Sequence, residues 1–231
     1  MSKYLSYVKC ILLISCLVFA VAGCSLKKSR KLEDMSHAEL LQKGLEELKK
    51  GDLPKALANL QMVKARYPYT DSAIVASLDL ADTYYKMNEF ATAYDLYNEF
   101  ERYHPKDPHI PYIKYQKGMC NFAQIKGFDR EQTHVQKARV EFERLINQFP
   151  NSEYTVMARR HLRKCILYLT KFEIYTGNFY FKQGKYLSAL QRYTYAIKNY
   201  PDLGQYHEAL EKISICKSKL AKSNKVALTR K

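Results

Sequence analysis

The stretch Ala56–Pro68, ALANLQMVKARYP, decides the fold because its spacing occurs four times in the chain. In each copy an Ala is followed four residues later by a bulky apolar residue and twelve residues later by a Pro. Residues with this spacing share one face of an α-helix, and a Pro cannot continue the helix. Each stretch therefore predicts a helix that ends just before its Pro. The four sets are Ala56, Leu60 and Pro68; Ala93, Tyr97 and Pro105; Ala138, Phe142 and Pro150; and Ala189, Tyr193 and Pro201.

Another helix is predicted before each of these stretches. A small residue lies twelve positions before the Ala in three copies, at Gly44, Ala81 and Gly177. Turn-forming pairs lie between the small residue and the Ala, and they predict a tight turn between two helices. The small residue and the Ala would allow the two helices to pack closely. The turn pairs are Gly51-Asp52, Asn88-Glu89 and Gly184-Lys185.

This unit resembles the tetratricopeptide repeat. That repeat has a small and an aromatic residue in its first helix, an Ala and a bulky residue in its second, and a closing Pro. Tyr84 and Tyr180 supply the aromatic residue here. Because one helical hairpin cannot bury its apolar face alone, such units stack into a right-handed superhelix. The predicted fold is all-α, with a concave side lined mainly by the first helices of the pairs.

Two intervals depart from the repeat. Gly118 precedes Ala138 by 20 residues rather than twelve, which indicates an insertion of eight around Gln124 to Thr133. Asp129 and Gln132 could form a capping box for the next helix. The inserted loop could equally be a partner-binding loop on a rigid scaffold, and the sequence leaves both interpretations open.

The second long interval runs from Pro150 to Gly177, where one extra helix of about fourteen residues fits. Counting it predicts about five helical pairs, or ten helices, with residues 205–220 as the terminal cap. The predicted division is a signal peptide over 1–23, a lipidated tether over 24–35, the repeat domain over 36–220 and a flexible tail over 221–231.

The N-terminus has the form of a secretory signal, with Lys3 and Lys9 before an apolar run that ends in small residues. The run is too short for a helix that crosses a bilayer. Its end, Val21-Ala22-Gly23-Cys24, resembles the lipobox of bacterial lipoproteins, in which the Cys is acylated after cleavage. An ordinary signal peptide with an incidental Cys is the alternative. Ser25 is not the Asp typical of inner-membrane retention, so the resemblance favours the periplasmic face of the outer membrane.

The mature chain would be strongly basic. Cleavage leaves 36 of the 38 basic residues against 23 acidic ones, a formal charge of +13. A secreted lipoprotein meets lipid headgroups and acidic protein surfaces, so no nucleic-acid partner is expected. Cys120, Cys165 and Cys216 fall in helical apolar patterns and are predicted to be small buried residues. His161 and Cys165 could share a helix face, but two ligands make half a zinc site, and no metal or cofactor is predicted.

No catalytic motif is recognisable: the chain has no Gly-rich phosphate loop, nucleophile elbow or metalloprotease motif. The sequence therefore favours a binding protein over an enzyme. Beyond the repeats, the lipobox, the insertion with Gly127-Phe128-Asp129-Arg130 and the stretch 148–154 (QFPNSEY) resemble the BamD (ComL) family. The resemblance covers about residues 36–220. It implies a lipoprotein subunit of the machinery that inserts β-barrel proteins into the outer membrane.

The family resemblance also implies partners. The N-terminal pairs would meet unfolded outer-membrane β-barrel proteins, and the C-terminal pairs would dock on the POTRA domain of BamA, beside other BAM lipoproteins. Arg192 matches a basic family position used for docking, although a solvated helix charge is the alternative. Gln183 stands where relatives can carry Arg. Phe128, Asp129 and Arg130 of the insertion are further candidates for partner binding.

Candidate substrate-binding residues lie near the ends of the first helices, where an apolar residue precedes a Lys. Such pairs suit an apolar peptide end with a free carboxylate. The alternative is that the apolar residue belongs to the core and the Lys covers it. A cell-wall or polysaccharide-export scaffold remains the competing function. The pairs are Leu48-Lys49, Tyr85-Lys86 and Phe181-Lys182.

Overall fold

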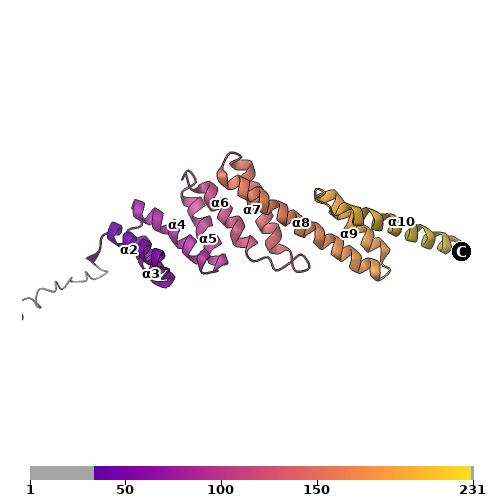
Figure 1. Cartoon of the computed structure of the whole chain (residues 1–231), viewed down its shortest axis with the longest axis horizontal. Helices are drawn as coiled ribbons and strands as arrows, with labels where there is room; N and C mark the ends of the chain where they lie inside the picture. The colour runs from indigo at the N-terminus through magenta and orange to yellow at the C-terminus, as the bar shows by residue number, and fades with distance from the viewer. Residues whose placement is uncertain (1–33, 230–231) are drawn as a thin grey trace, which may run out of the picture.

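The computed structural model describes residues 34–229, with side chains up to residue 223. The predicted signal peptide, Cys24 and most of the tether lie outside these residues. The described part is all-α, and its helices form one elongated row with α2 and α10 at opposite ends (Figure 1). Its helices are α2 (His37–Lys50), α3 (Leu53–Arg66), α4 (Asp71–Lys86), α5 (Phe90–Tyr103), α6 (Ile110–Phe122), α7 (Thr133–Gln148), α8 (Glu153–Lys182), α9 (Tyr186–Asn199) and α10 (Tyr206–Thr229).

Four antiparallel hairpins, from α2–α3 to α8–α9, and the final helix α10 make up the described row, and each helix packs mainly on its neighbours in sequence. Every second helix of a hairpin ends as the repeat predicts. The C-cap residues of α3, α5, α7 and α9 are Tyr67, His104, Phe149 and Tyr200, each followed by Pro. The predicted tetratricopeptide-type fold is confirmed.

The three predicted turns are also present. Gly51, Asn88 and Gly184 all have positive φ values, of 79°, 63° and 72°. Gly adopts this left-handed conformation without penalty, and Asn tolerates it better than most residues. The turn at Gly51 leads directly into α3, where Asp52 accepts a hydrogen bond from the Lys55 amide.

At the small residues Gly44 and Gly177, the bulky residue of the second helix packs directly on the first helix. A Cβ on Gly44 would lie 2.9 Å from Leu60 Cδ2, and one on Gly177 would lie 2.6 Å from Tyr193 Cε1. A side chain at either glycine would thus occupy space that the bulky residue fills. Ala56 and Ala189 of the second helices are fully buried, as close packing of the two helices requires.

The predicted count of ten helices differs from the nine in residues 34–229 because two expected helices are continuous. α8 is 30 residues long and combines the extra helix with the first helix of the last hairpin. No turn-forming pair interrupts Glu153–Lys182, and Gly177 remains helical because Tyr193 packs on it. At the other end, α10 continues to Thr229, beyond the predicted domain boundary at residue 220.

Candidate protein-binding surfaces

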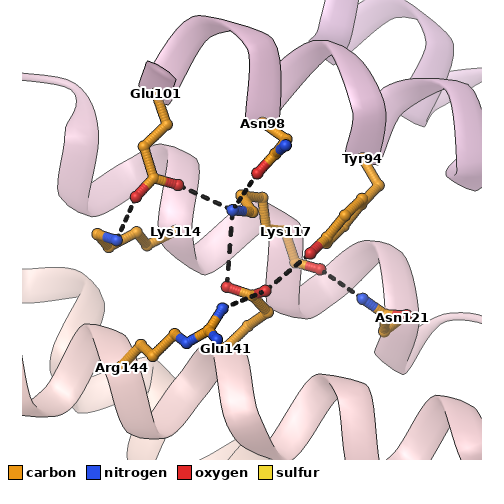
Figure 2. A network of polar contacts seen from close by, with 8 residues as sticks. All are labelled: Tyr94, Asn98, Glu101, Lys114, Lys117, Asn121, Glu141 and Arg144. Carbon is orange, nitrogen blue, oxygen red and sulfur yellow. Dashed lines mark hydrogen bonds and ion pairs between the residues drawn. The ribbon is translucent and has the colours of Figure 1, made fainter. Parts of the chain in front are cut away.

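A network of charged side chains lies between α5, α6 and α7 (Figure 2). The Lys117 side chain is only 5% exposed, and its Nζ donates to Glu101 Oε2 at 2.8 Å and to Asn98 Oδ1 at 2.9 Å. Lys114 pairs with the other oxygen of Glu101. Burial opposes ionisation of Glu101, but the hydrogen bonds from Lys114 and Lys117 outweigh it and lower its pKa. Each buried charge thus has an opposite charge beside it.

Glu141 extends this network to α7. Its Oε2 lies 3.8 Å from Lys117 Nζ, and its Oε1 accepts a hydrogen bond of 2.8 Å from the Tyr94 hydroxyl. Arg144, exposed at the surface, reaches the same Oε1 at 3.3 Å. Burial is the largest cause of the raised pKa of Tyr94, and the hydrogen bond to Glu141 raises it further. The network therefore connects the second and third hairpins through charge-assisted contacts.

A groove runs over the outer side of this network. A cavity of about 530 Å³ lies between the start of α5 and α7, with Tyr94, Glu141 and Arg144 in its wall. A second hollow adjoins it on the side of the inserted loop, where Lys126 and Arg130 form part of the wall. Aromatic, amide and charged side chains line both hollows. The two cavities share Phe90, Gln124 and His134.

The inserted loop is held by Gln132 in a way that the sequence did not predict. Gln132 Nε2 lies 3.0, 3.2 and 2.6 Å from the carbonyl oxygens of Gly127, Phe128 and Arg130. The predicted capping box of Asp129 and Gln132 is wrong, because α7 begins at Thr133 and its N-cap, Gln132, makes no side-chain cap bond. The Gln132 amide is instead directed back into the loop.

The three candidate residues of the loop differ in their surroundings. Phe128 is half-buried, and its ring meets Tyr175 of α8 edge-on at 6.0 Å, with Lys171 Nζ 5.8 Å from the ring centre. Asp129 and Arg130 are exposed, with 3.9 Å between their charged atoms. Phe128 therefore attaches the loop to α8, and the two charged residues face solvent. A cavity of about 510 Å³ borders Phe128 and Tyr175.

Arg192 is not a free helix charge. Its Nη1 donates to Glu173 Oε2 of α8 at 3.1 Å. The Arg192 side chain is 43% exposed, whereas that of Glu173 is 9% exposed. The pair fixes where the guanidinium lies while leaving part of it open to a second carboxylate.

The three candidate substrate pairs share one arrangement. Leu48, Tyr85 and Phe181 are half-buried and pack against the cores of their hairpins. Tyr85 meets Phe90, the first residue of α5, edge-on at 5.3 Å. The lysines that follow them, Lys49, Lys86 and Lys182, are exposed. The apolar members thus serve hairpin packing, and the lysines are the accessible part of each pair.

Cys120, Cys165 and Cys216 are free and buried, as their helical pattern predicts. His161 stacks on Phe142 at 5.6 Å, and burial lowers its pKa. Among residues 34–229, no group of three or more potential ligands is placed to hold a metal ion. No helix in the same range combines the length and apolar composition needed to cross a membrane.

The stacked hairpins and their grooves define a tetratricopeptide-repeat scaffold. The family described as "YfiO: Outer membrane lipoprotein" matches residues 33–231. The chain therefore belongs to the YfiO family of outer membrane lipoproteins, and it is a non-enzymatic scaffold, as its sequence led us to expect.

Curated relatives over most of the chain are named "Outer membrane protein assembly factor BamD". The one from Neisseria meningitidis serogroup A is 27% identical over 96% of this chain and 89% of its own length. The one from Vibrio cholerae is 26% identical over 82% of both chains. These names agree with the family expected from the lipobox, the insertion and the repeats.

The chain is also similar to solved structures. A tetratricopeptide repeat protein from Parabacteroides merdae gives a TM-score of 0.45 at 16% identity, covering 94% of this chain and 91% of that one. MamA from Desulfovibrio magneticus gives a TM-score of 0.41 at 14% identity, covering 72% and 76%.

Proposed function

We propose that this chain is the BamD-type subunit of the β-barrel assembly machinery. In this proposal it is held by a lipid on Cys24 at the periplasmic face of the outer membrane. It binds BamA, other BAM lipoproteins and unfolded β-barrel proteins. The observation that carries the proposal is the family match over residues 33–231, together with relatives named as assembly factors.

The docking surface for BamA would include Arg192. Because Glu173 already positions the guanidinium and leaves 43% of the Arg192 side chain exposed, a POTRA carboxylate could form a charge-assisted hydrogen bond without ordering a flexible side chain first. Phe128, Asp129 and Arg130 lie on the loop attached to the same long helix, α8, and are proposed as a second contact for a partner.

The substrate surface would lie at the N-terminal hairpins. Lys49 and Lys86 are exposed beside Leu48 and Tyr85, whose half-buried side chains leave an apolar edge next to each ammonium group. Such an edge fits a peptide that ends in an apolar residue and a carboxylate. Replacing Lys49 and Lys86 by Glu should abolish crosslinking to a barrel C-terminal peptide. Unchanged crosslinking would exclude Lys49 and Lys86 from the substrate surface.

The test of the whole proposal is copurification of the lipidated, full-length protein from membranes. We expect it to bring down BamA. Recovery of cell-wall synthases or hydrolases without BamA would favour a scaffold for cell-wall enzymes. A parallel Cys24→Ala variant, expected in the soluble periplasmic fraction, tests the lipid anchor separately.

A further inference from the structure

The C-terminal end of α10 carries an unusual concentration of positive charge. From Lys212 to Lys231 the sequence contains seven basic residues and no acidic one. The first part of α10 packs on α9 through Ala209, Ile213 and Cys216. The rest of the helix continues to Thr229 at the end of the row of hairpins (Figure 1).

Three of the four lysines in the described part of this segment face solvent. Lys217, Lys219 and Lys222 are exposed, and none of them makes an ion pair with any residue whose side chain the structure describes. Lys212, by contrast, lies over the Phe181 ring at 4.7 Å. The helix dipole favours cations only in the last turn of a helix, so it does not account for lysines that begin well before it.

We propose that the described part of this basic segment, residues 212–222, binds the headgroups of an anionic phospholipid membrane. Each Lys or Arg close to such a surface contributes about 1 kcal/mol of attraction. Six of the seven basic residues are Lys, which acts as a hydrated point charge, whereas Arg is the residue suited to bidentate docking on a protein carboxylate. The segment therefore fits a diffuse layer of phosphates better than a shaped acidic protein surface.

Two further observations support a membrane. Ile215 is only half-buried, and Lys219 and Lys222, four and seven residues later, share its helix face. The long stems of these lysines allow the ammonium groups to reach headgroups while apolar atoms stay beneath them. The chain also belongs to a family of outer membrane lipoproteins and so works beside a bilayer. The inference goes beyond the proposed assembly function and does not depend on any BAM partner.

The two ends of the row would then both meet the membrane. In the sequence, Cys24 precedes α2 at the N-terminal end of the row, and α10 lies at the opposite end of the row (Figure 1). A lipid at one end and a basic helix at the other would hold the row of hairpins along the bilayer surface. The row would then not project away from the membrane.

Vesicle binding tests this proposal with the mature chain carrying Cys24→Ser, so that no lipid holds it. The vesicles are phosphatidylcholine alone or phosphatidylcholine mixed with phosphatidylglycerol. The variant replaces Lys217, Lys219 and Lys222 by Gln. The control replaces three exposed lysines elsewhere by Gln, which gives the same net charge: Lys106, Lys164 and Lys198.

We expect the unsubstituted chain to bind only the vesicles that contain phosphatidylglycerol. The α10 variant should bind them at least about tenfold more weakly, while the control changes less than about twofold. Equal losses in both would show that net charge alone drives binding and would overturn the proposal. No binding by the unsubstituted chain would overturn it as well, and would direct attention to an acidic protein. Circular dichroism should show equal helix content in all three proteins.

Discussion

Lys117 Nζ lies 2.8 Å from Glu101 Oε2 in the space between α5 and α6, almost without access to solvent. Removing one partner of a buried pair leaves the other charge uncompensated, which costs about 3–5 kcal/mol. Because Lys114 still faces Glu101, we expect Lys117→Met to lower the free energy of unfolding by about 3 kcal/mol, measured by urea denaturation.

The matched control for this prediction is Lys64→Met. Lys64 pairs with Glu99 at 3.0 Å, but both side chains are more than one-third exposed. Loss of an exposed pair costs at most about 1 kcal/mol. If both variants lost the same free energy of unfolding, the buried network would contribute no more to stability than a surface ion pair does.

Gly118 should tolerate Ala poorly. A Cβ there would lie 2.7 Å from Phe142 Cδ1, a ring fixed in the core of the third hairpin. Overpacking of a core costs about 1–3 kcal/mol, which outweighs the gain of about 1 kcal/mol in helix propensity. We expect a net loss of about 1 kcal/mol in thermal or urea unfolding. Adding Phe142→Leu to Gly118→Ala should recover part of the lost stability. If Gly118→Ala alone were more stable than the unsubstituted chain, the close contact between position 118 and Phe142 would be refuted.

Asp79 should make stability depend on pH. The pKa of the Asp79 carboxyl is raised to about 6, mainly by burial and further by the negative charge of Asp82. A raised carboxyl pKa means that the folded state holds its proton longer than the unfolded chain, so the free energy of unfolding falls as pH rises from about 4 to about 6.

Asp79→Asn removes this titration. We expect the variant to be more stable than the unsubstituted chain at pH 7 by about 1 kcal/mol, a discounted value because Asp79 is partly exposed. The two proteins should converge near pH 4. If the difference persisted unchanged at that pH, a cause other than ionisation of Asp79 would be responsible.

The repeat predicted the hairpins because their decisive contacts are local. The residue that fills the space beside Gly44 is Leu60, sixteen positions later in the same hairpin, so a fixed spacing in sequence corresponds to a fixed contact. The sequence did not predict the continuous α8. Counting helices from the intervals between repeat positions assumes a turn between the extra helix and the last hairpin, but no residue between Glu153 and Lys182 forms one.

The charged network was not predicted for a different reason. Glu101, Lys117 and Glu141 come from three helices, and their pairing depends on how neighbouring hairpins are placed. A partial signal was present, since Lys114 lies four residues before Gly118 and so shares its helix face. Charged residues on a buried face require partners, but the period of the repeat does not say which ones.

The central claim, a BamD-type subunit of the assembly machinery, is tested most directly by binding of the mature chain to the periplasmic POTRA segment of BamA. We expect binding that Arg192→Glu weakens by about tenfold or more, equivalent to about 1.4 kcal/mol. Arg159→Glu, at an exposed position on α8, should leave binding unchanged. Absence of binding by the folded, unsubstituted chain would contradict the claim.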